Sequence, residues 1–267
     1  MKRLIVSILM LLVSTFSIAK PLVVGIVPQY AASKIVSQWR PLLDVLSEQT
    51  GVQFELRTAK TIPEFEQRLA EGQYDIAYMN PYHFITFNVE PGYKALAHQK
   101  KKKIHGIIVA SVGDSLTLDD LEGEQLAFPS PAAFAASILP RATMTQKGIN
   151  FTPIYVGSHD SSFLAVSKGF FKAGGGVVRT FKALPEETKS QLKIIWKSPG
   201  YTPHAIAYHP RVDPQTIDTL VKALVTLSDS EEGLNALTTL GFQDGFKQVT
   251  DESWDDIREL MTGTIGM

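Results

Sequence analysis

The stretch LVVGIV, Leu22 to Val27, decides the fold class of this chain. It is a continuous apolar run, which is typical of a strand buried on both faces of a parallel sheet. The segment that follows, residues 33–49, has apolar residues at helical spacing and is followed by a helix-ending glycine, Gly51. A buried strand that leads directly into an amphipathic helix predicts an α/β fold.

The same alternation continues along the chain. We expect further strands at 52–57, 74–79, 107–110, 125–128, 152–156, 174–179, 192–196 and 205–208, and further helices at 62–71, 133–147, 161–169, 214–226, 231–240 and 253–261. Repeated strand–helix–strand units predict an α/β protein with right-handed crossovers. So many strands exceed what one sheet of a single domain usually holds, so two α/β lobes are expected.

The N-terminus has the pattern of a secretory signal. Lys2 and Arg3 precede an apolar run at 4–13, and small residues follow at Ser17 and Ala19. The apolar run is shorter than the roughly 20 residues that span a bilayer. The chain has 0 cysteines, which excludes disulfides, thiolate metal sites and a lipid-modified N-terminal cysteine. We therefore expect residues 1–19 to be a cleaved signal peptide, and the mature protein to be soluble, periplasmic and not lipid-anchored.

The charge balance argues against a nucleic-acid partner. The chain has 26 Lys+Arg and 27 Asp+Glu, a formal net charge of −1. It therefore lacks the broad positive field that a phosphate backbone requires, and any bound anion must be held locally. One local concentration of charge is the run Lys100 to Lys103, which is either a solvated connection or a docking point for an acidic partner.

Polar and aromatic residues follow several of the predicted strands, where ligands bind in open α/β sheets. Ser158 to Ser161 is the strongest of these segments, because it combines capping side chains with the opening of a helix, whose free N–H groups and dipole would hold an anion. His159 could donate to that anion, whereas Asp160 would repel it unless it accepts a proton carried by the ligand or binds a cationic group on it. The alternative is that Ser158 or Asp160 only caps the helix.

Other site types are disfavoured. The consecutive Ser-His-Asp of 158–160 cannot easily form a hydrolase relay, and no G-x-S-x-G elbow is present. His204 and His209 do not have the spacing of a metal site, and Gly174 to Gly176 lacks the Lys-Ser/Thr of a P-loop, so close backbone packing is expected there. Arg179 is a lone cation after that strand that could face a cleft. We expect no metal and no cofactor.

Four segments together resemble a known family. Pro28-Gln29, Tyr78 to His83, Ser158 to Ser161 and Gly174 to Gly176, in this order, are similar to the phosphonate/phosphate-type periplasmic substrate-binding proteins of ABC transporters. The resemblance covers nearly the whole mature chain. It implies the type II periplasmic binding protein fold, in which two lobes joined by two crossover strands trap a ligand by hinge closure. The implied lobes are 20–105 with 206–267, and 106–205.

The resemblance also implies a ligand site. Its residues would be Tyr30, Tyr78, Asn80, Tyr82, Ser130, Ala133, Phe134, His159, Asp160 and Ser161. The family typically has a Ser-Thr-Ser run at one helix start, where this chain has Ala133-Phe134-Ala135. The missing hydroxyls remove hydrogen bonds worth about 0.5–1.5 kcal/mol each, and Phe134 would offer an apolar wall instead.

The expected function is therefore capture of a small anionic ligand, a phosphorus oxyanion such as phosphonate, phosphite or phosphate, by a monomer without chemistry of its own. The partner would be an ABC transporter permease. Two alternatives remain open. The protein could be a ligand-sensing module that regulates a membrane kinase or cyclase, or an enzyme of the same fold such as a pyrimidine-precursor synthase.

Overall fold

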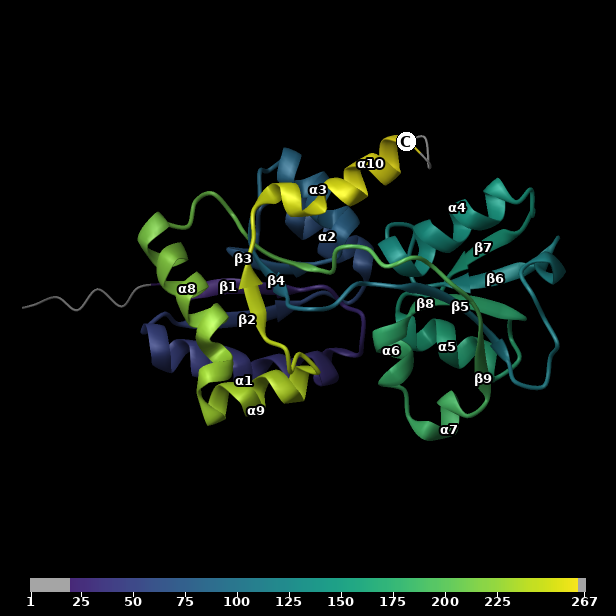
Figure 1. Ribbon diagram of the computed structural model, residues 1–267, viewed down its shortest axis with the longest axis horizontal. Helices are drawn as coiled ribbons and strands as arrows, with labels where there is room; N and C mark the ends of the chain where they lie inside the picture. The colour runs from purple at the N-terminus through teal and green to yellow at the C-terminus, as the bar shows by residue number, and fades with distance from the viewer. Residues whose placement is uncertain (1–19, 264–267) are drawn as a thin grey trace, which may run out of the picture.

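The computed structural model describes residues 20–263, and the predicted signal peptide lies outside the described residues. The chain forms two mixed β-sheets that lie side by side along the longest axis of the molecule, each with helices on both faces (Figure 1). No helix within residues 20–263 combines the length and the apolar character needed to cross a membrane.

The first sheet has six strands in the order β11-β4-β10-β3-β1-β2. The bounds are β1 Leu22–Ile26, β2 Phe54–Thr58, β3 Ile76–Met79, β4 Lys94–Gln99, β10 Ala205–Tyr208 and β11 Phe246–Gln248. Strand β1 pairs in parallel with β2 and β3, whereas β10 runs antiparallel to both β3 and β4. The sheet therefore combines strands from both ends of the chain.

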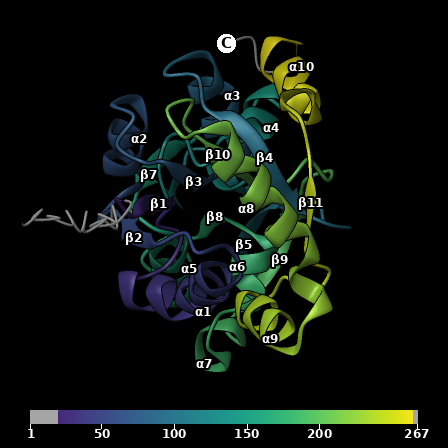
Figure 2. The ribbon, with the colours of Figure 1, turned by 90° about the vertical axis from the view of Figure 1, so that its left-hand side faces the viewer.

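Helices cover both faces of this sheet, as Figures 1 and 2 show from two directions. On one face lie α1 Ala32–Thr50 and α9 Glu231–Leu240, and on the other lie α2 Ile62–Ala70 and α3 Pro81–Val89. The remaining helices of this part are α8 Pro214–Thr226 and α10 Asp255–Gly263. Because helices cover both faces, Val23, Val24 and Ile26 of β1 are all buried, as the continuous apolar run predicts.

The second sheet has five strands in the order β7-β6-β8-β5-β9. The bounds are β5 Gly106–Ser111, β6 Gln125–Phe128, β7 Thr152–Tyr155, β8 Ala173–Val177 and β9 Leu192–Lys197. Its helices are α4 Leu139–Gln146, α5 His159–Ser167, α6 Val178–Lys182, α7 Glu186–Lys189 and the π-helical turn η2 Phe134–Ile138.

Two connections, residues 100–105 and 198–204, join the sheets, and they pair with each other. Ile104 and Tyr201 form an antiparallel bridge with N···O distances of 2.9 and 3.0 Å. The amide of Gly106 then donates to Ser198 Oγ at 2.9 Å. The chain thus leaves the first sheet and returns to it at adjacent positions.

Glycines allow η2 to lie against the second sheet. A Cβ at Gly175 would meet the carbonyl oxygen of Ala136, and one at Gly106 would meet that of Ala135. A Cβ at Gly176 would meet the ring of Phe163. The close backbone packing predicted for the glycine-rich strand is confirmed.

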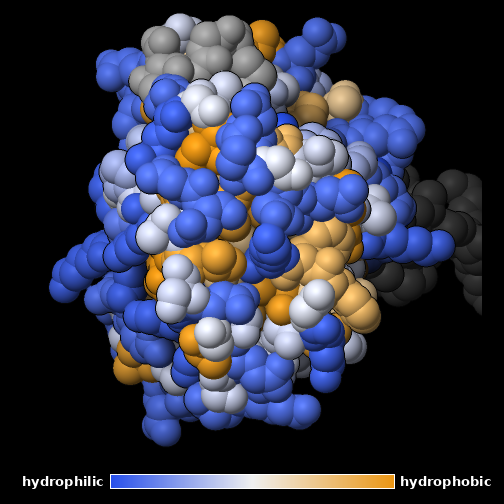
Figure 3. Space-filling model, turned by 90° about the vertical axis from the view of Figure 1, so that its right-hand side faces the viewer, coloured by the Kyte–Doolittle hydropathy of each residue, from blue (hydrophilic) through white to orange (hydrophobic). Residues whose placement is uncertain are grey.

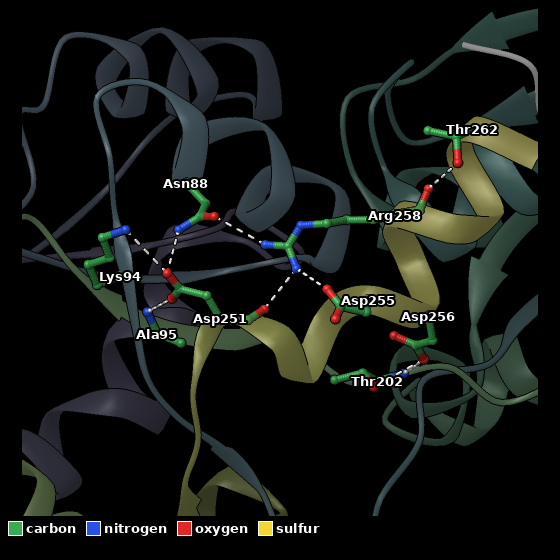
Figure 4. A network of polar contacts seen from close by, with 9 residues as sticks. All are labelled: Asn88, Lys94, Ala95, Thr202, Asp251, Asp255, Asp256, Arg258 and Thr262. Carbon is green, nitrogen blue, oxygen red and sulfur yellow. Dashed lines mark hydrogen bonds and ion pairs between the residues drawn. The ribbon is translucent and has the colours of Figure 1, made fainter.

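A polar network holds the C-terminal segment against the first sheet (Figure 4). Asp251 accepts hydrogen bonds from the Ala95 amide at 2.8 Å, Asn88 Nδ2 at 3.0 Å and Lys94 Nζ at 3.3 Å. Arg258 donates to the Asp251 carbonyl at 2.9 Å and to Asn88 Oδ1 at 3.1 Å.

The same segment also contacts the second connection. One oxygen of Asp256 accepts from Thr202 N at 2.9 Å and from Thr202 Oγ1 at 3.1 Å (Figure 4). The indole N–H of Trp254 donates to the Pro203 carbonyl at 2.9 Å. Helix α10 is therefore fixed to the path by which the chain returns to the first sheet.

Three details of the sequence prediction were wrong. Strand β8 ends at Val177, so Arg179 lies on α6 and not at the end of a strand. The helix expected from residue 133 opens with the π-helical turn η2, and the helix expected from Ser161 begins at His159. Both sheets are mixed, since β4, β5, β9, β10 and β11 run antiparallel to the strands beside them.

Candidate ligand-binding site

The candidate site lies where residues that follow β1 and β3 meet residues that follow β6, β7 and β8. Tyr30 follows β1, Tyr78 lies on β3, and both side chains are buried. Tyr78 is flanked by two rings, with its centroid 4.7 Å from that of Trp39 and 5.0 Å from that of His204. Burial raises the pKa of both tyrosines, so they act as neutral aromatic walls.

Arg179 provides the positive charge of the site. Its guanidinium lies 5.7 Å from the centre of the Tyr30 ring and donates a hydrogen bond to the Gln29 side-chain oxygen. Among residues 20–263, no carboxylate lies within ion-pair distance of it. A guanidinium stays charged, and a partly buried charge without a counter-charge is unfavourable. An anionic ligand would supply the missing charge.

His159 is neutral and has a defined tautomer. Its side chain is buried, and burial and the nearby Arg179 lower its pKa to about 3. Its Nδ1 lies 3.2 Å from Thr180 Oγ1, and the Thr180 hydroxyl donates its proton to the Val177 carbonyl at 3.0 Å. Nδ1 must therefore carry the hydrogen, which leaves Nε2 as an acceptor. This differs from the donor role expected from the sequence.

Asp160 contributes a second acceptor. Burial raises the pKa of its carboxyl group, against the opposing effect of Lys34, and its buried Oδ1 has no hydrogen-bond partner among the described residues. Ser158, and not Asp160, caps the helix, because Ser158 Oγ accepts from the Ser161 amide at 3.1 Å. The Ser161 amide is therefore already occupied.

Asn80 connects the two halves of the site. Its Oδ1 caps α3 by accepting from the His83 amide at 2.9 Å, and its Nδ2 donates to the Ala132 carbonyl at 3.1 Å. Ala132 precedes η2 in the second sheet's half of the chain. The same Nδ2 lies 3.1 Å from His83 Nε2, which in turn lies 2.9 Å from Glu66 Oε1. Asn80 is thus held rigidly.

Two cavities adjoin these residues. One has a volume of about 10 Å³ and is lined by Asn80, Ala133, Phe134 and His159. This is about the space that a single water needs. The other has about 230 Å³ and is lined by Tyr78, Arg179 and His204 among others.

The ten residues implied by the resemblance therefore differ in placement. Asn80, Ala133, Phe134 and His159 line the smaller cavity, and Tyr78 lines the larger one. Tyr30 and Asp160 line neither cavity, although the ring of Tyr30 lies beside the Arg179 guanidinium. Tyr82, Ser130 and Ser161 line neither cavity. Ser130 Oγ is buried, and no described residue is its hydrogen-bond partner.

Sequence reasoning missed some of the residues that the structure brings to the site. Gln29 and Thr180 orient Arg179 and His159, and His204, considered only as a metal ligand, stacks on Tyr78. The sequence marks Arg179 as a lone cation but not as a central residue of the candidate site. The glycine-rich strand that ends two residues before Arg179 was the available signal.

Two α/β sheets joined by two paired connections, with ligand-type residues where the sheets meet, define a two-lobed binding protein of the type II fold. Comparison with known proteins gives the family. Residues 24–254 match the family described as "ABC transporter, phosphonate, periplasmic substrate-binding protein", and this chain belongs to it. The resemblance and the fold predicted from the sequence are confirmed, and the chain is a periplasmic substrate-binding protein of the ABC transporter type.

Individual relatives are distant in sequence and similar in fold. The phosphate-import protein PhnD of Mycolicibacterium smegmatis is 24% identical over 276 residues, covering 88% of this chain and 83% of the relative. PhnD1 from Prochlorococcus marinus in complex with methylphosphonate has a TM-score of 0.84 at 16% identity, covering 93% of this chain and 99% of PhnD1. A binding protein component of an ABC phosphonate transporter from Pseudomonas aeruginosa has a TM-score of 0.82 at 18% identity, covering 90% of this chain and 85% of that one.

Proposed function

We propose that this protein binds a phosphorus oxyanion between its two lobes and delivers it to an ABC transporter permease. The observation that carries the proposal is Arg179, a partly buried cation at the meeting of the lobes with no carboxylate partner among residues 20–263. The names of the relatives support the ligand class, since one is a phosphate-import protein and another was solved with methylphosphonate.

In this proposal each residue has a physical role. Arg179 neutralises the oxyanion with charge-assisted hydrogen bonds, and Tyr30 and Tyr78 cover its apolar part. His159 Nε2 and Asp160 are acceptors, so they favour a ligand that carries a P–OH or an ammonium group over one that is fully deprotonated. Ala133 and Phe134 form an apolar wall, whereas Tyr82, Ser130 and Ser161 take no direct part.

We further propose that residues 20–105 with 206–267, and 106–205, are the two moving lobes, and that the paired connections are the hinge. The mature protein would begin after residue 19, act as a monomer in the periplasm, and present both lobes to the permease when closed. Apolar surface lies among charged side chains at the end of the molecule formed by the second sheet (Figure 3), which is compatible with such docking. The family is one of transport binding proteins, which favours transport over an enzymatic role.

Thermal denaturation of the mature protein with phosphate, phosphite, methylphosphonate and aminoethylphosphonate tests this function. A ligand at 100 times its Kd adds about 2.7 kcal/mol to the free energy of unfolding. The Arg179→Gln variant should bind at least tenfold more weakly, about 1.4 kcal/mol, because it loses the counter-charge.

Arg40→Gln is the matched control, since Arg40 lies exposed on α1 in an ion pair with Asp44. It should bind like the wild type. A wild-type protein that none of the four oxyanions stabilises would contradict the proposed function, as would equal binding by Arg179→Gln.

A further inference from the structure

The 230 Å³ cavity beside Arg179 has a strongly positive lining. Lys102, Lys103 and Lys182 also line it, and none of the described residues in its wall is Asp or Glu. Lys102 pairs with Asp244 at 3.3 Å, whereas Lys103 and Lys182 form no ion pair with any residue in 20–263. More positive charge therefore surrounds this space than one monoanion neutralises.

The cavity also contains a polar atom without a partner. His204 lines it, is only 6% exposed, and its Nε2 has no hydrogen-bond partner among the described residues. Buried polar atoms in folded proteins are almost always hydrogen-bonded. A ligand group placed between His204 and Arg179 would satisfy this nitrogen and the guanidinium together.

The positive lining continues outward from the cavity. A more open groove of about 460 Å³ shares Lys102 and Lys103 with it and is lined in addition by Lys101 and Lys247. Within the described part of the chain, no carboxylate lines this groove either. Cavity and groove together reach the size of sites for ligands considerably larger than a single phosphate, roughly 300–1,000 Å³.

We propose that the natural ligand is a polyanion with two or more linked phosphoryl groups, as a free oligophosphate or as part of a larger molecule. This inference rests on the proposed function and narrows its ligand class. The first phosphoryl group binds Arg179 and His204 in the cavity, and the following ones extend past Lys103 toward Lys247. A single oxyanion would satisfy Arg179 and leave these lysines without a counter-charge.

Calorimetry with orthophosphate, pyrophosphate and tripolyphosphate tests this with ligands that differ only in length. We expect tripolyphosphate to bind the mature protein at least tenfold more tightly than orthophosphate. The double variant Lys101→Gln/Lys247→Gln should lose at least tenfold in tripolyphosphate affinity and less than about twofold in orthophosphate affinity, because both lysines line only the outer groove and the inner cavity is unchanged.

Lys222→Gln is the control, because Lys222 is exposed on α8 away from the cavity. It should leave all three affinities unchanged, and unliganded melting temperatures would show that every variant is folded. Equal affinity for the three phosphates, or an equal loss with Lys222→Gln, overturns the polyanion inference while the proposed function stands. Absence of binding by every phosphate and phosphonate overturns both.

Discussion

Three histidines are kept neutral by their surroundings. His98, His159 and His204 are buried, and burial lowers the pKa of each, with the charge of Arg179 adding to the effect at the last two. Their unfolded-state pKa is near 6.5. Below about pH 6.5 these histidines bind a proton in the unfolded chain but stay neutral in the folded protein. Each of them therefore lowers the free energy of unfolding as the pH falls below that value.

The protein should therefore lose stability on mild acidification. For His159 the loss begins near pH 6.5 and continues until its folded pKa of about 3, at up to about 1.4 kcal/mol per pH unit. Urea denaturation at pH 7.5 and 5.0 gives the free energy of unfolding at each pH. The His159→Gln variant should show a smaller difference between these two free energies than the wild type. The less buried His209 is the comparison, because His209→Gln should reduce it by less. An unchanged difference in His159→Gln would contradict this account.

The sequence was informative about residue types and less so about their orientations. His159 and Asp160 could be selected from a helix-opening motif, but the proton on His159 is fixed by Thr180, which lies 21 residues further on. Arg179 could be seen only as an isolated cation, because its importance depends on Gln29 and Tyr30 from the other lobe. Contacts between distant segments leave no periodic pattern in a sequence.

At the scale of single elements, η2 depends on the two glycines beneath it. A side chain at Gly175 would displace Ala136 or the ring of Phe128, and Gly106 is similarly confined by Ala135. Because η2 carries Phe134, these glycines determine where the Phe134 side chain lies in the site.

Gly175→Ala should lower the free energy of unfolding by about 1–3 kcal/mol, since overpacking forces backbone shifts. Urea denaturation would measure this. Gly113→Ala is the matched control, because the nearest atom to its added Cβ would be Ser111 Oγ at 3.9 Å. It should change stability by less than about 0.5 kcal/mol. Equal stability of the two variants would show that η2 can yield.

Elements with a clear apolar pattern over their whole length were predicted with the right bounds, whether they are long helices or short strands. Helices α8 and α9 and strands β6 and β10 have the predicted bounds, because their apolar spacing continues over the whole element. Helix α3 is absent from the helices predicted from the sequence, although Asn80 as N-cap and Pro81 at the first helical position are helix-start signals. The five-residue α6 is too short to show helical periodicity.

At the scale of the whole molecule, the two lobes are held together by direct contacts. Arg179 bonds to Gln29, Asn80 Nδ2 to the Ala132 carbonyl at 3.1 Å, and Lys34 Nζ to the Ala183 carbonyl at 3.3 Å. Ala133, Phe134 and Val177 also belong to the same buried apolar cluster as the core of the first sheet. The number of predicted strands was enough to predict two lobes. The contacts between the lobes join residues far apart in the sequence, and no local sequence pattern predicts them.

The C-terminal segment should stabilise the return path of the chain. Asp256→Ala removes two charge-assisted hydrogen bonds to Thr202, and we expect a loss of about 1.5–3 kcal/mol. Thermal denaturation without ligand is the measurement. Asp218→Ala serves as the control, because Asp218 is exposed on α8 and takes no part in this network, and it should leave the melting temperature unchanged. A normal melting temperature for Asp256→Ala would mean that Trp254 alone suffices.

The pairing of Ile104 with Tyr201 has a consequence for how such a chain can be assembled. The chain leaves the first sheet next to Ile104 and returns to it next to Tyr201. Because these two residues are neighbours, the chain could be joined directly from one to the other if the segment between them were removed. The segment between them is therefore a cassette: it could be exchanged as one piece between related chains, carrying Arg179 and His159 with it, while Tyr30 and Tyr78 stay behind. The residues proposed to recognise the ligand are thus divided between a segment that could be exchanged and a part of the chain that would stay unchanged.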